Sequence, residues 1–567
     1  MTEHIIFLFY ISLFVFSTIG YGEVFSRVFN KELLNYNIGF IGLVGFFSLS
    51  LISLISSYFF AHNFIHNIIL HIIGIIGFIL FLVRDKKNKK ETKYFTILLL
   101  ILLIGSYVYK NHDDFPYYHL TYSLNLSENK FIIGTGAFGH GFRTFSSIFY
   151  YHSILYMPYI KFYLFHIGTF FILVFFNYII LDNLFKNFKE NKINFLYYFK
   201  ILSIIFINIA FYRISEHGTD RSAQILLLLI FLFFFDLIFF ERNQKKISSK
   251  INLFLILIFM ASSMKAIYYM YLVLVPIIFI NKNFLFKFLK KKNILLISIL
   301  SLSISGNLVT NYFNTGCFLY PAVKTCVGEN SWSIPKEEVK KMKIHYEWWS
   351  KAGGGPNYKS EIKPEIYVKK FKWVKNWIDR HFFNKVTDTL FGIIFICLLV
   401  YLVFRAFSKK KRKSKLNYLQ LFITLIIPII FLIEWFINHP SMRYGGYVLV
   451  GLPFFIITSF ILEKLDIKKK KIMIGTIIFV FISLTLFFAR NIARLNKEVN
   501  FYKYNINKSP YFYVENVVSE NIFDDGNFKV YSTANNKMCW ASKTPCSNFK
   551  KIKSEKFFGL NVVYRDK

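Results

Sequence analysis

Residues 33–83 read LLNYNIGFIGLVGFFSLSLISLISSYFFAHNFIHNIILHIIGIIGFILFLV. This run contains no Asp, Glu, Lys or Arg. One helix needs about 20 apolar residues to cross roughly 30 Å of hydrocarbon, so the run is long enough for two. The sequence therefore predicts two membrane spans here, with a turn near His62 and Asn63.

The rest of the chain continues this pattern in both directions. Of its 567 residues, 55% are hydrophobic and only 18% are charged, which excludes an ordinary soluble protein. We expect an all-α polytopic membrane protein with about fourteen transmembrane helices. The other spans are expected at 5–21, 94–110, 162–181, 194–212, 222–240, 251–264, 266–281, 294–312, 387–404, 416–436, 444–462 and 472–489.

The formal net charge is +37, from 69 Lys and Arg against 32 Asp and Glu. In a soluble chain this excess would indicate a nucleic-acid partner. Here the basic residues cluster between apolar stretches, so they indicate topology and a lipid bilayer rather than nucleic acid. The positive-inside rule predicts that six basic loops are cytoplasmic, namely 84–93, 186–200, 241–250, 282–292, 409–415 and 464–471.

This orientation puts both termini and the longest connections on the outer face of the membrane. We expect a transmembrane domain over 1–489, with outer loops at 111–160 and 313–386, and a small extracytoplasmic α+β domain over 490–567. The cysteines are consistent with it, because Cys317 and Cys326 share one outer loop and Cys539 and Cys546 share the tail. We expect two local disulfides. Zinc is the less favoured alternative, because neither pair has a close ligand spacing.

An acidic pair follows the span at 94–110 directly. Asp113 and Asp114 are adjacent, and His119 follows them at the start of a long outer loop. Two neighbouring carboxylates repel each other and raise one pKa, so they can accept a proton or hold a cation. The alternative is that they only cap and solvate the helix end.

A glycine-rich stretch, GTGAFGHGFR at 134–143, lies in the same loop. It matches the dinucleotide-binding pattern, but we reject that interpretation because the stretch has no βαβ context and lies outside the cytoplasm. Arg143 at its end is a candidate ligand for a phosphate. A simple turn between two interfacial helices is the alternative.

Further ionisable residues lie at the predicted outer ends of later spans. Glu216, Asp220 and Arg221 lie in a connection too short to leave the bilayer surface, so they are expected to face a shared cavity or to form salt bridges among themselves. Lys265 divides a long apolar run and is expected at the tip of a short hairpin, where it either neutralises a lipid phosphate or only snorkels. Arg443 follows Pro440 in an outer turn and also suits a phosphate.

The layout of a long outer loop after an early span, an acidic pair at its start and further charges at outer helix ends resembles the GT-C superfamily of polyprenyl-linked glycosyltransferases. More narrowly, several segments look like an uncharacterised family of bacterial polytopic proteins of GT-C type. These segments are Asp114-Phe-Pro-Tyr-Tyr-His119, Glu216-His-Gly-Thr-Asp220, Met264-Lys265, Thr315-Gly-Cys-Phe-Leu-Tyr-Pro321, Arg443-Tyr-Gly-Gly446 and Cys539-Trp540-Ala-Ser-Lys-Thr-Pro545-Cys546.

The resemblance implies sugar transfer on the outer face of a bacterial cytoplasmic membrane from a polyprenyl-phosphate-linked donor, in cell-envelope glycan synthesis. Asp113 or Asp114 would be the base or a ligand of a divalent metal ion. Glu216 and Asp220 would be second acids, and a further set would bind substrate and surround the phosphate: His119, Arg143, Arg221, Lys265 and Arg443. Two other hypotheses remain, namely a lipid-linked oligosaccharide polymerase or ligase, which would depend on outer arginines and histidines, and a non-enzymatic transporter or flippase.

Overall fold

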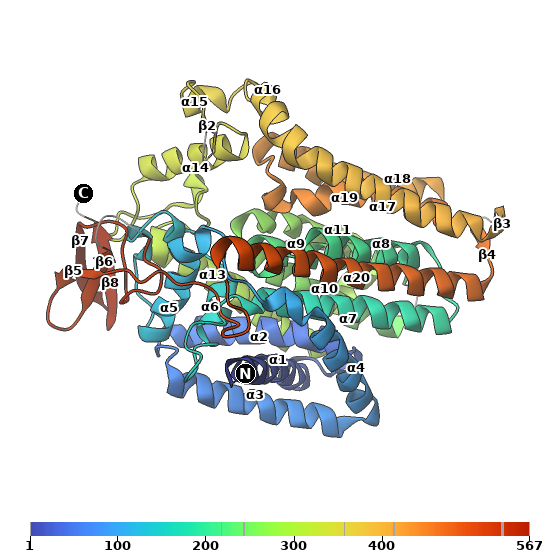
Figure 1. Ribbon diagram of the computed structural model, residues 1–567, viewed down its shortest axis with the longest axis horizontal. Helices are drawn as coiled ribbons and strands as arrows, with labels where there is room; N and C mark the ends of the chain where they lie inside the picture. Colours follow the sequence, from blue (N-terminus) through green and yellow to red (C-terminus); the bar gives the residue numbers. More distant parts are fainter. Residues whose placement is uncertain are drawn as a thin grey trace.

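The computed structural model describes residues 2–216, 218–241, 244–355, 358–411, 414, 416–533 and 538–565. Long helices lie side by side through most of the molecule (Figure 1). They are α1 (Thr2–Phe29), α2 (Ile38–Ser57), α3 (Phe64–Arg84), α4 (Lys86–Leu102), α7 (Ile167–Lys189), α8 (Phe195–Ala210), α9 (Gly218–Phe235), α10 (Gln244–Met264), α13 (Ile294–Thr315), α17 (Thr387–Ala406), α18 (Tyr418–Asn438), α19 (Tyr447–Glu463) and α20 (Lys469–Tyr502).

Within the described residues, 11 helical segments are long and apolar enough to cross a membrane, or up to 12 if a bent pair counts as one span. The prediction of a polytopic, mostly helical membrane protein is confirmed, whereas the number of fourteen remains a prediction. Three of the expected spans correspond to helices that do not meet this criterion alone. α4 begins among lysines, α8 has 16 residues, and Ala266–Phe279 is bent by 107° against Lys282–Phe288.

Shorter helices and turns connect the long ones. The α-helices are α5 (Leu120–Glu128), α6 (Ser147–Ser153), α11 (Leu274–Phe279), α12 (Lys282–Phe288), α14 (Lys336–Ser350), α15 (Pro364–Tyr367) and α16 (Val374–Trp377). The 3₁₀ and π turns are η1 (Lys31–Asn35), η2 (Leu103–Ser106), η3 (Phe115–His119), η4 (Thr135–Ala137), η5 (Gly141–Arg143), η6 (Ile214–Glu216), η7 (Asp236–Phe240), η8 (Ala266–Val273), η9 (Lys291–Asn293), η10 (Val323–Thr325), η11 (Ile378–Val386) and η12 (Met442–Gly446).

The strands form four two-stranded antiparallel hairpins or ladders in the described part of the chain. They are β1 (Gly354–Gly355) with β2 (Tyr358–Lys359), β3 (Ser408–Lys411) with β4 (Leu465–Ile467), β5 (Ser519–Asp524) with β6 (Lys529–Thr533), and β7 (Ile552–Phe557) with β8 (Leu560–Arg565). β3 and β4 lie at one end of the helices, whereas α5, α14 and the C-terminal strands lie at the other, which we call the loop end (Figure 1).

The run that decides the fold class forms α2 and α3, which both pack against α1. Asn37 and Asn63 cap the two helices, each accepting a hydrogen bond from a backbone N–H three residues later. The α1 contacts are so close that a Cβ added at Gly20 would lie 1.8 Å from the Gly74 carbonyl oxygen, and one at Gly45 would lie 1.7 Å from the Thr18 carbonyl oxygen. Small residues permit this approach, which is how helices pack when lipid supplies no hydrophobic driving force.

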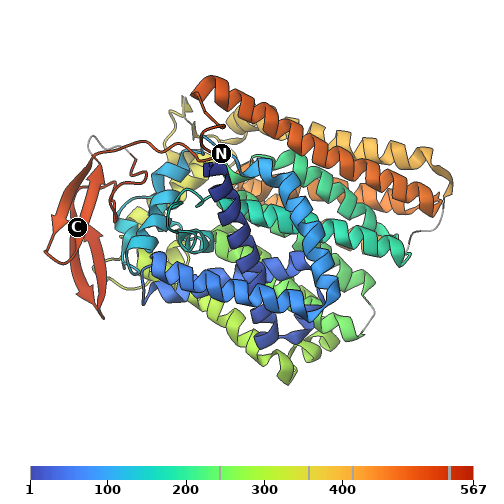
Figure 2. The same cartoon turned by 60° about the horizontal axis from the view of Figure 1, so that its bottom comes forward.

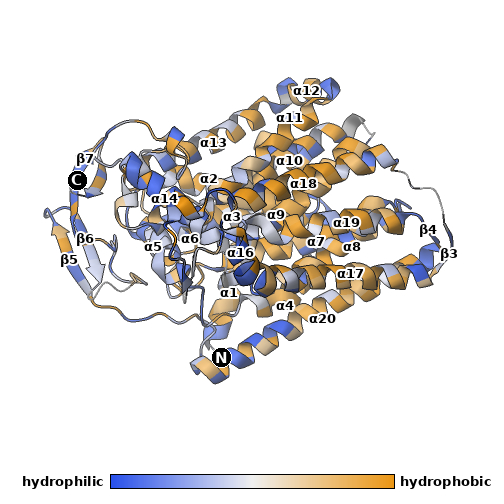
Figure 3. Ribbon diagram, turned by 90° about the horizontal axis from the view of Figure 1, so that it is seen from above, coloured by the Kyte–Doolittle hydropathy of each residue, from blue (hydrophilic) through white to orange (hydrophobic). Residues whose placement is uncertain are grey.

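The colouring by hydropathy separates the two environments (Figure 3). Hydrophobic residues cover the long helices, and hydrophilic residues gather at the loop end and around β3 and β4. β3 and β4, whose strands overlap two of the predicted basic loops, therefore lie at the end opposite the long loops, which is the segregation that the positive-inside rule uses.

The C-terminal segment docks on the first long loop instead of standing apart (Figure 2). The predicted domain boundary at residues 489 and 490 lies within α20, which continues to Tyr502. Beyond it, the Val563 N–H donates to the Ile133 carbonyl at 2.8 Å, and the Asn548 N–H donates to the Phe138 carbonyl at 2.7 Å. The tail thus covers the loop that carries the acidic pair.

Candidate functional site

Four charged side chains from distant parts of the sequence meet at the loop end of the helices. Asp114 immediately precedes η3, and Asp220 lies in the first turn of α9. Lys265 is an extended residue between α10 and η8, and Arg443 lies in η12. Each residue therefore lies at a helix end or a helix break, where backbone irregularity is compatible with a membrane only if protein or a cavity surrounds it.

Arg443 connects the two carboxylates. Its Nη2 donates to Asp114 Oδ2, and its Nε donates to Asp220 Oδ2. Lys265 Nζ donates to the other oxygen of Asp220, Oδ1, at 2.5 Å. The four side chains carry two positive and two negative charges, and we call them the acid–base network. Charge-assisted hydrogen bonds of this kind are the strong ones in proteins.

Burial differs between the two acids. The Asp220 side chain is 1% exposed, whereas the Asp114 side chain is 26% exposed. Asp220 is also held through its backbone, because the Tyr268 hydroxyl donates to its carbonyl at 3.2 Å. Of the two carboxylates, Asp114 is thus the one that a second molecule can reach.

The turn that carries Arg443 is fixed on both sides. Gln224 Nε2 donates to the Arg443 carbonyl at 3.1 Å, and Trp435 Nε1 donates to the Ser441 carbonyl at 3.0 Å. Gly445 has φ +93°, a conformation that a side chain would disfavour, and this lets the turn lead directly into α19. The guanidinium therefore reaches both carboxylates from a rigid backbone.

The electrostatics of the acidic junction are dominated by Arg443. Burial raises the pKa of Asp114, but the charge of Arg443 outweighs it and holds the pKa at about 2. Burial lowers the pKa of His112, and the Asp114 N–H donates to His112 Nδ1 at 3.2 Å, as expected for a neutral imidazole. Burial also lowers the pKa of His119, to about 3. At neutral pH the junction therefore contains an ionised Asp114 beside two neutral imidazoles.

A cavity of about 280 Å³ opens beside the network. Asp220 and Arg443 form part of its wall, and Arg221 and Lys385 add two further cations. The remaining lining residues are His112, Gln224, Trp349, His381, Pro440, Ser441, Met442 and Tyr447. A pocket with this excess of cations can hold an anionic group. Asp114 is not one of its lining residues, but it is bonded to Arg443, which is.

The predicted site residues separate into those within this site and those outside it. Asp113 is exposed and takes no part in the acid–base network. His119 is buried next to the acidic junction. Arg221 lines the cavity while its Nη1 donates to the Arg213 carbonyl at 2.6 Å. The Glu216 side chain lies outside the described part of the structure.

Arg143 does not reach the cavity. Its side chain is completely buried, donates from Nε to the Gly136 carbonyl at 3.0 Å and forms an ion pair with Glu338 at 2.7 Å. Glu338 also pairs with Arg565 at 2.6 Å. Arg143 therefore joins the first loop to α14 and the C-terminal strand β8, which is a structural role in the arrangement described.

Sequence patterns did not indicate Gln224, His381 or Lys385 as site residues. His381 and Lys385 are one helical turn apart in η11, which could have indicated a shared face. Trp373 and Trp377 of the same region are buried, whereas Trp349 is 36% exposed. Trp377 is buried, and its Nε1 donates to the Pro440 carbonyl at 2.5 Å, so it supports the turn before Arg443.

The two predicted cysteine pairs are disulfides, Cys317–Cys326 and Cys539–Cys546. The second closes a loop against the acidic junction, because the Trp540 N–H donates to the Pro116 carbonyl at 3.1 Å. The tail thereby contacts the π turn that follows Asp114.

The side chains of the acid–base network do not form a typical metal-binding site. In the described residues, no three His, Cys, Asp or Glu side chains come together as a ligand group. Both network carboxylates already accept hydrogen bonds from cations, so they offer a divalent ion few unused lone pairs.

Comparison with known proteins relates the chain to a protein family. Residues 5–450 match a family model described as a domain of unknown function, DUF8201. The chain belongs to the DUF8201 family. The match covers α1 to the start of α19 and so includes every member of the acid–base network. No curated protein and no solved structure matches the chain.

Proposed function

We propose that this DUF8201 protein is a GT-C-type glycosyltransferase that works on the outer face of a bacterial cytoplasmic membrane. Its donor is a polyprenyl-phosphate-linked sugar, and its acceptor is a hydroxyl group of a cell-envelope glycan. The observation that carries the proposal is Arg443 held between Asp114 and Asp220 beside a cavity with two more cations.

The proposed reaction exchanges one bond for another. The acceptor oxygen forms a bond to the anomeric carbon of the sugar as the bond from that carbon to the phosphate oxygen breaks. The acceptor proton goes to the Asp114 carboxylate, and the products are the glycosylated acceptor and polyprenyl phosphate. General base catalysis of this kind contributes about 10²- to 10⁴-fold, and cations that stabilise the departing phosphate contribute further.

The two acids have different roles in this proposal. Asp114 is the base, because it is the more exposed carboxylate. Asp220 is the positioning acid, because it is buried and holds both Arg443 and Lys265. This division follows the rule that paired carboxylates take different roles when their environments differ.

Donor binding would also activate the base. The charge of Arg443 holds the pKa of Asp114 down, whereas burial raises it. A donor phosphate that engages Arg443 shares that charge, so the pKa of Asp114 rises toward that of a useful proton acceptor. Without substrate, the network therefore holds Asp114 ionised with a low pKa. Donor binding raises that pKa and makes the carboxylate a better proton acceptor.

The second candidate is a lipid-linked oligosaccharide polymerase or ligase. It is favoured by His112 and His381, which line the same cavity and offer bases other than a carboxylate. In that reaction His381→Gln would abolish turnover, whereas Asp114→Asn would retain most of it. A transporter or flippase would instead move the intact donor without releasing polyprenyl phosphate.

The test uses the full chain in proteoliposomes with a panel of polyprenyl-phosphate sugars that differ in the sugar. The readout is polyprenyl phosphate released in the presence of membrane glycan. We expect Asp114→Asn to reduce release at least 100-fold, with Asp113→Asn, its exposed neighbour, as the matched control. Full turnover by Asp114→Asn would overturn the proposal, as would the absence of release from every donor by the wild-type protein.

A further inference from the structure

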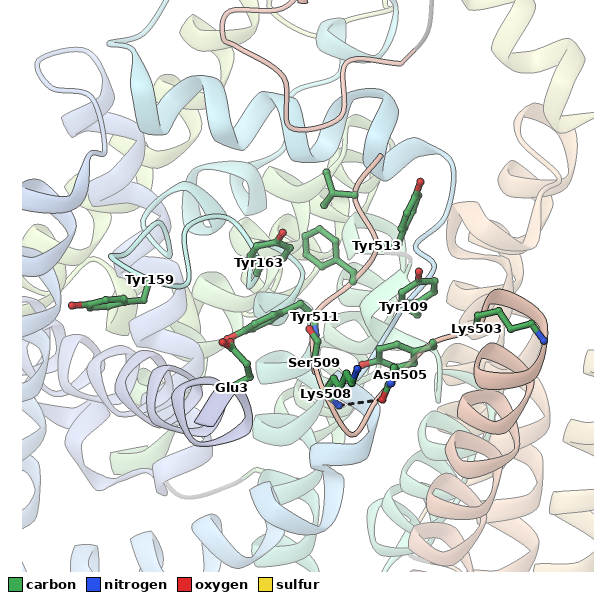
Figure 4. Close-up of a pocket in the computed structure, with 13 residues that line it drawn as sticks. Glu3, Tyr109, Tyr159, Tyr163, Lys503, Asn505, Lys508, Ser509, Tyr511 and Tyr513 are labelled. Carbon is green, nitrogen blue, oxygen red and sulfur yellow. Dashed lines mark hydrogen bonds between the residues drawn. The ribbon is translucent and has the colours of Figure 1, made fainter. Parts of the chain in front are cut away.

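A second and larger cavity lies near the N-terminus of α1, with a volume of about 670 Å³ (Figure 4). Glu3 of α1 forms one side, and the segment that follows α20, residues 503–514, forms most of the rest. Tyr109 and Tyr163 complete the wall from two other parts of the chain. Because its rings, ammonium groups and hydroxyls come from four segments, this cavity is built by the tertiary fold. We call it the tyrosine pocket.

Stacked aromatic rings form its surface. The rings of Tyr109 and Tyr504 stack at 4.8 Å, and those of Tyr163 and Tyr511 stack at 4.9 Å. Tyr513 lies beside Tyr109, with 5.7 Å between ring centroids, and its side chain is 47% exposed (Figure 4). Tyrosine combines a flat apolar face with a hydroxyl, which is the combination that a saccharide ring requires, since a sugar presents C–H groups on its faces and hydroxyls at its edge.

The charges of the pocket favour a ligand with a negative group. Lys508 lines it together with a single acid, Glu3, whereas the ammonium of Lys503 points away from the other lining side chains (Figure 4). Glu3 and Tyr511 point toward one another in Figure 4, so this acid is directed at a wall residue. Asn505 and Ser509 add polar groups at the same side (Figure 4). Ammonium groups of this kind attract phosphate and carboxylate substituents.

The pocket and the acid–base network share one segment of chain. Tyr109 lies five residues before Asp114, and the Tyr513 N–H donates to the Tyr109 carbonyl at 2.8 Å. The Phe512 ring meets the Phe115 ring edge to face at 5.0 Å. A molecule bound among these rings would therefore contact a residue that is only five positions along the chain from the proposed base.

We propose that the tyrosine pocket binds the saccharide part of an anionic acceptor glycan. The role as acceptor rests on the proposed transferase function, whereas the binding of a saccharide stands on the pocket alone. The saccharide could be free or attached to a lipid, and both sources present the same chemistry. Ile5 and Phe9 of α1 are exposed apolar residues just beyond Glu3, so the pocket is next to the surface that lipid would cover.

The test measures saccharide binding to the full-length protein in nanodiscs without donor. The probes are free oligosaccharides, neutral and phosphorylated, and the same oligosaccharides attached to a lipid anchor in the nanodisc. We expect phosphorylated probes to bind more tightly than neutral ones, and Lys508→Gln to remove that preference. Tighter binding of the anchored probes would identify a lipid-linked acceptor, and equal binding would identify a free glycan end.

Tyr513→Ala is the decisive variant because it removes an exposed aromatic face from the wall of the pocket. We expect it to weaken binding of the saccharide probes about 10-fold, because stacking on that ring is lost. Tyr418→Ala removes an exposed tyrosine at the opposite end of the helices and is the matched control, which should bind as well as the wild type. The proposal fails if no probe binds the wild-type protein at millimolar concentration, or if Tyr513→Ala binds as well as the wild type. If the wild-type protein binds the saccharide probes but has no transferase activity, the proposed function is wrong and the assignment of the pocket as a saccharide site stands.

Discussion

Arg443 donates a hydrogen bond from Nη2 to Asp114, a residue 329 positions earlier in the chain. Its Nε donates to Asp220, so one guanidinium connects the first long loop to the start of α9. This contact sets the charge state of the candidate base and joins two distant parts of the fold. Arg443 is therefore the residue whose replacement should change both stability and activity.

Arg443→Lys should not be a conservative change. A lysine ammonium is a compact charge on a flexible chain and lacks the rigid planar fork that donates from Nε and Nη2, so the geometry that joins Asp114 to Asp220 would be lost. We expect a loss of about 3 kcal/mol in the free energy of unfolding and a loss of at least 100-fold in transfer. Thermal unfolding in detergent and the release of polyprenyl phosphate measure the two effects. Wild-type turnover by this variant would show that the bridge has no part in the reaction.

Acid should weaken the network over a defined pH range. The pKa of Asp114 is lowered from 3.8 to about 2 in the folded protein. A lowered pKa contributes stability that is fully present above about pH 4 and is lost as the pH falls toward about 2. The stability advantage of the wild type over Asp114→Asn should therefore shrink across this range, which thermal unfolding at a series of pH values would detect. An advantage that does not change with pH would mean that Arg443 does not hold Asp114 ionised.

Glu338→Gln should separate structural support from chemistry. Glu338 pairs with the fully buried Arg143 and with Arg565, so its loss leaves a buried guanidinium without a carboxylate. We expect the free energy of unfolding to fall by about 3 kcal/mol. Activity per folded molecule should stay near the wild-type value, because neither arginine lines the cavity beside Arg443. A change in the KM for donor at unchanged stability would instead place Arg143 at the phosphate.

The predicted orientation can be tested with single introduced cysteines. Phe558 in the β7–β8 turn is 91% exposed, and Tyr418 at the start of α18 is 76% exposed. The natural cysteines do not interfere, because four are in disulfides and Cys397 is buried. An impermeant thiol reagent should label Phe558→Cys in intact cells and Tyr418→Cys only after lysis. The reverse result would invert the topology.

Much of the helical architecture is predictable because apolar length is a local property. The uncharged run at 33–83 forms α2 and α3, as its length requires. The ends of helices are less predictable. α4 begins at Lys86 inside a predicted basic loop, because Asp85 caps it and lysines are good helix formers. α20 continues past the predicted end of its span to Tyr502, because a helix does not have to stop at the membrane surface.

The candidate site is less predictable than the helices that carry it. Sequence patterns place Asp114, Asp220, Lys265 and Arg443 at helix ends, because charged residues are expensive in hydrocarbon. They do not distinguish Asp114 from Asp113, since only the local turn decides which side chain faces Arg443. They also do not indicate that Arg143 pairs with Glu338, or that Lys385 lines the cavity, because these depend on how distant helices are rotated against one another.

The sequence by itself thus determined that this chain is a polytopic membrane protein and which charged residues lie at the ends of its helices. Both follow from the free-energy cost of transferring charge and unpaired backbone groups into hydrocarbon. This cost depends on the composition of each segment alone. Only the tertiary structure decided that Arg443 joins Asp114 to Asp220, because an ion pair requires two side chains to be close in space. That closeness results from the packing of η3, α9, η8 and η12 against one another, which no single segment encodes.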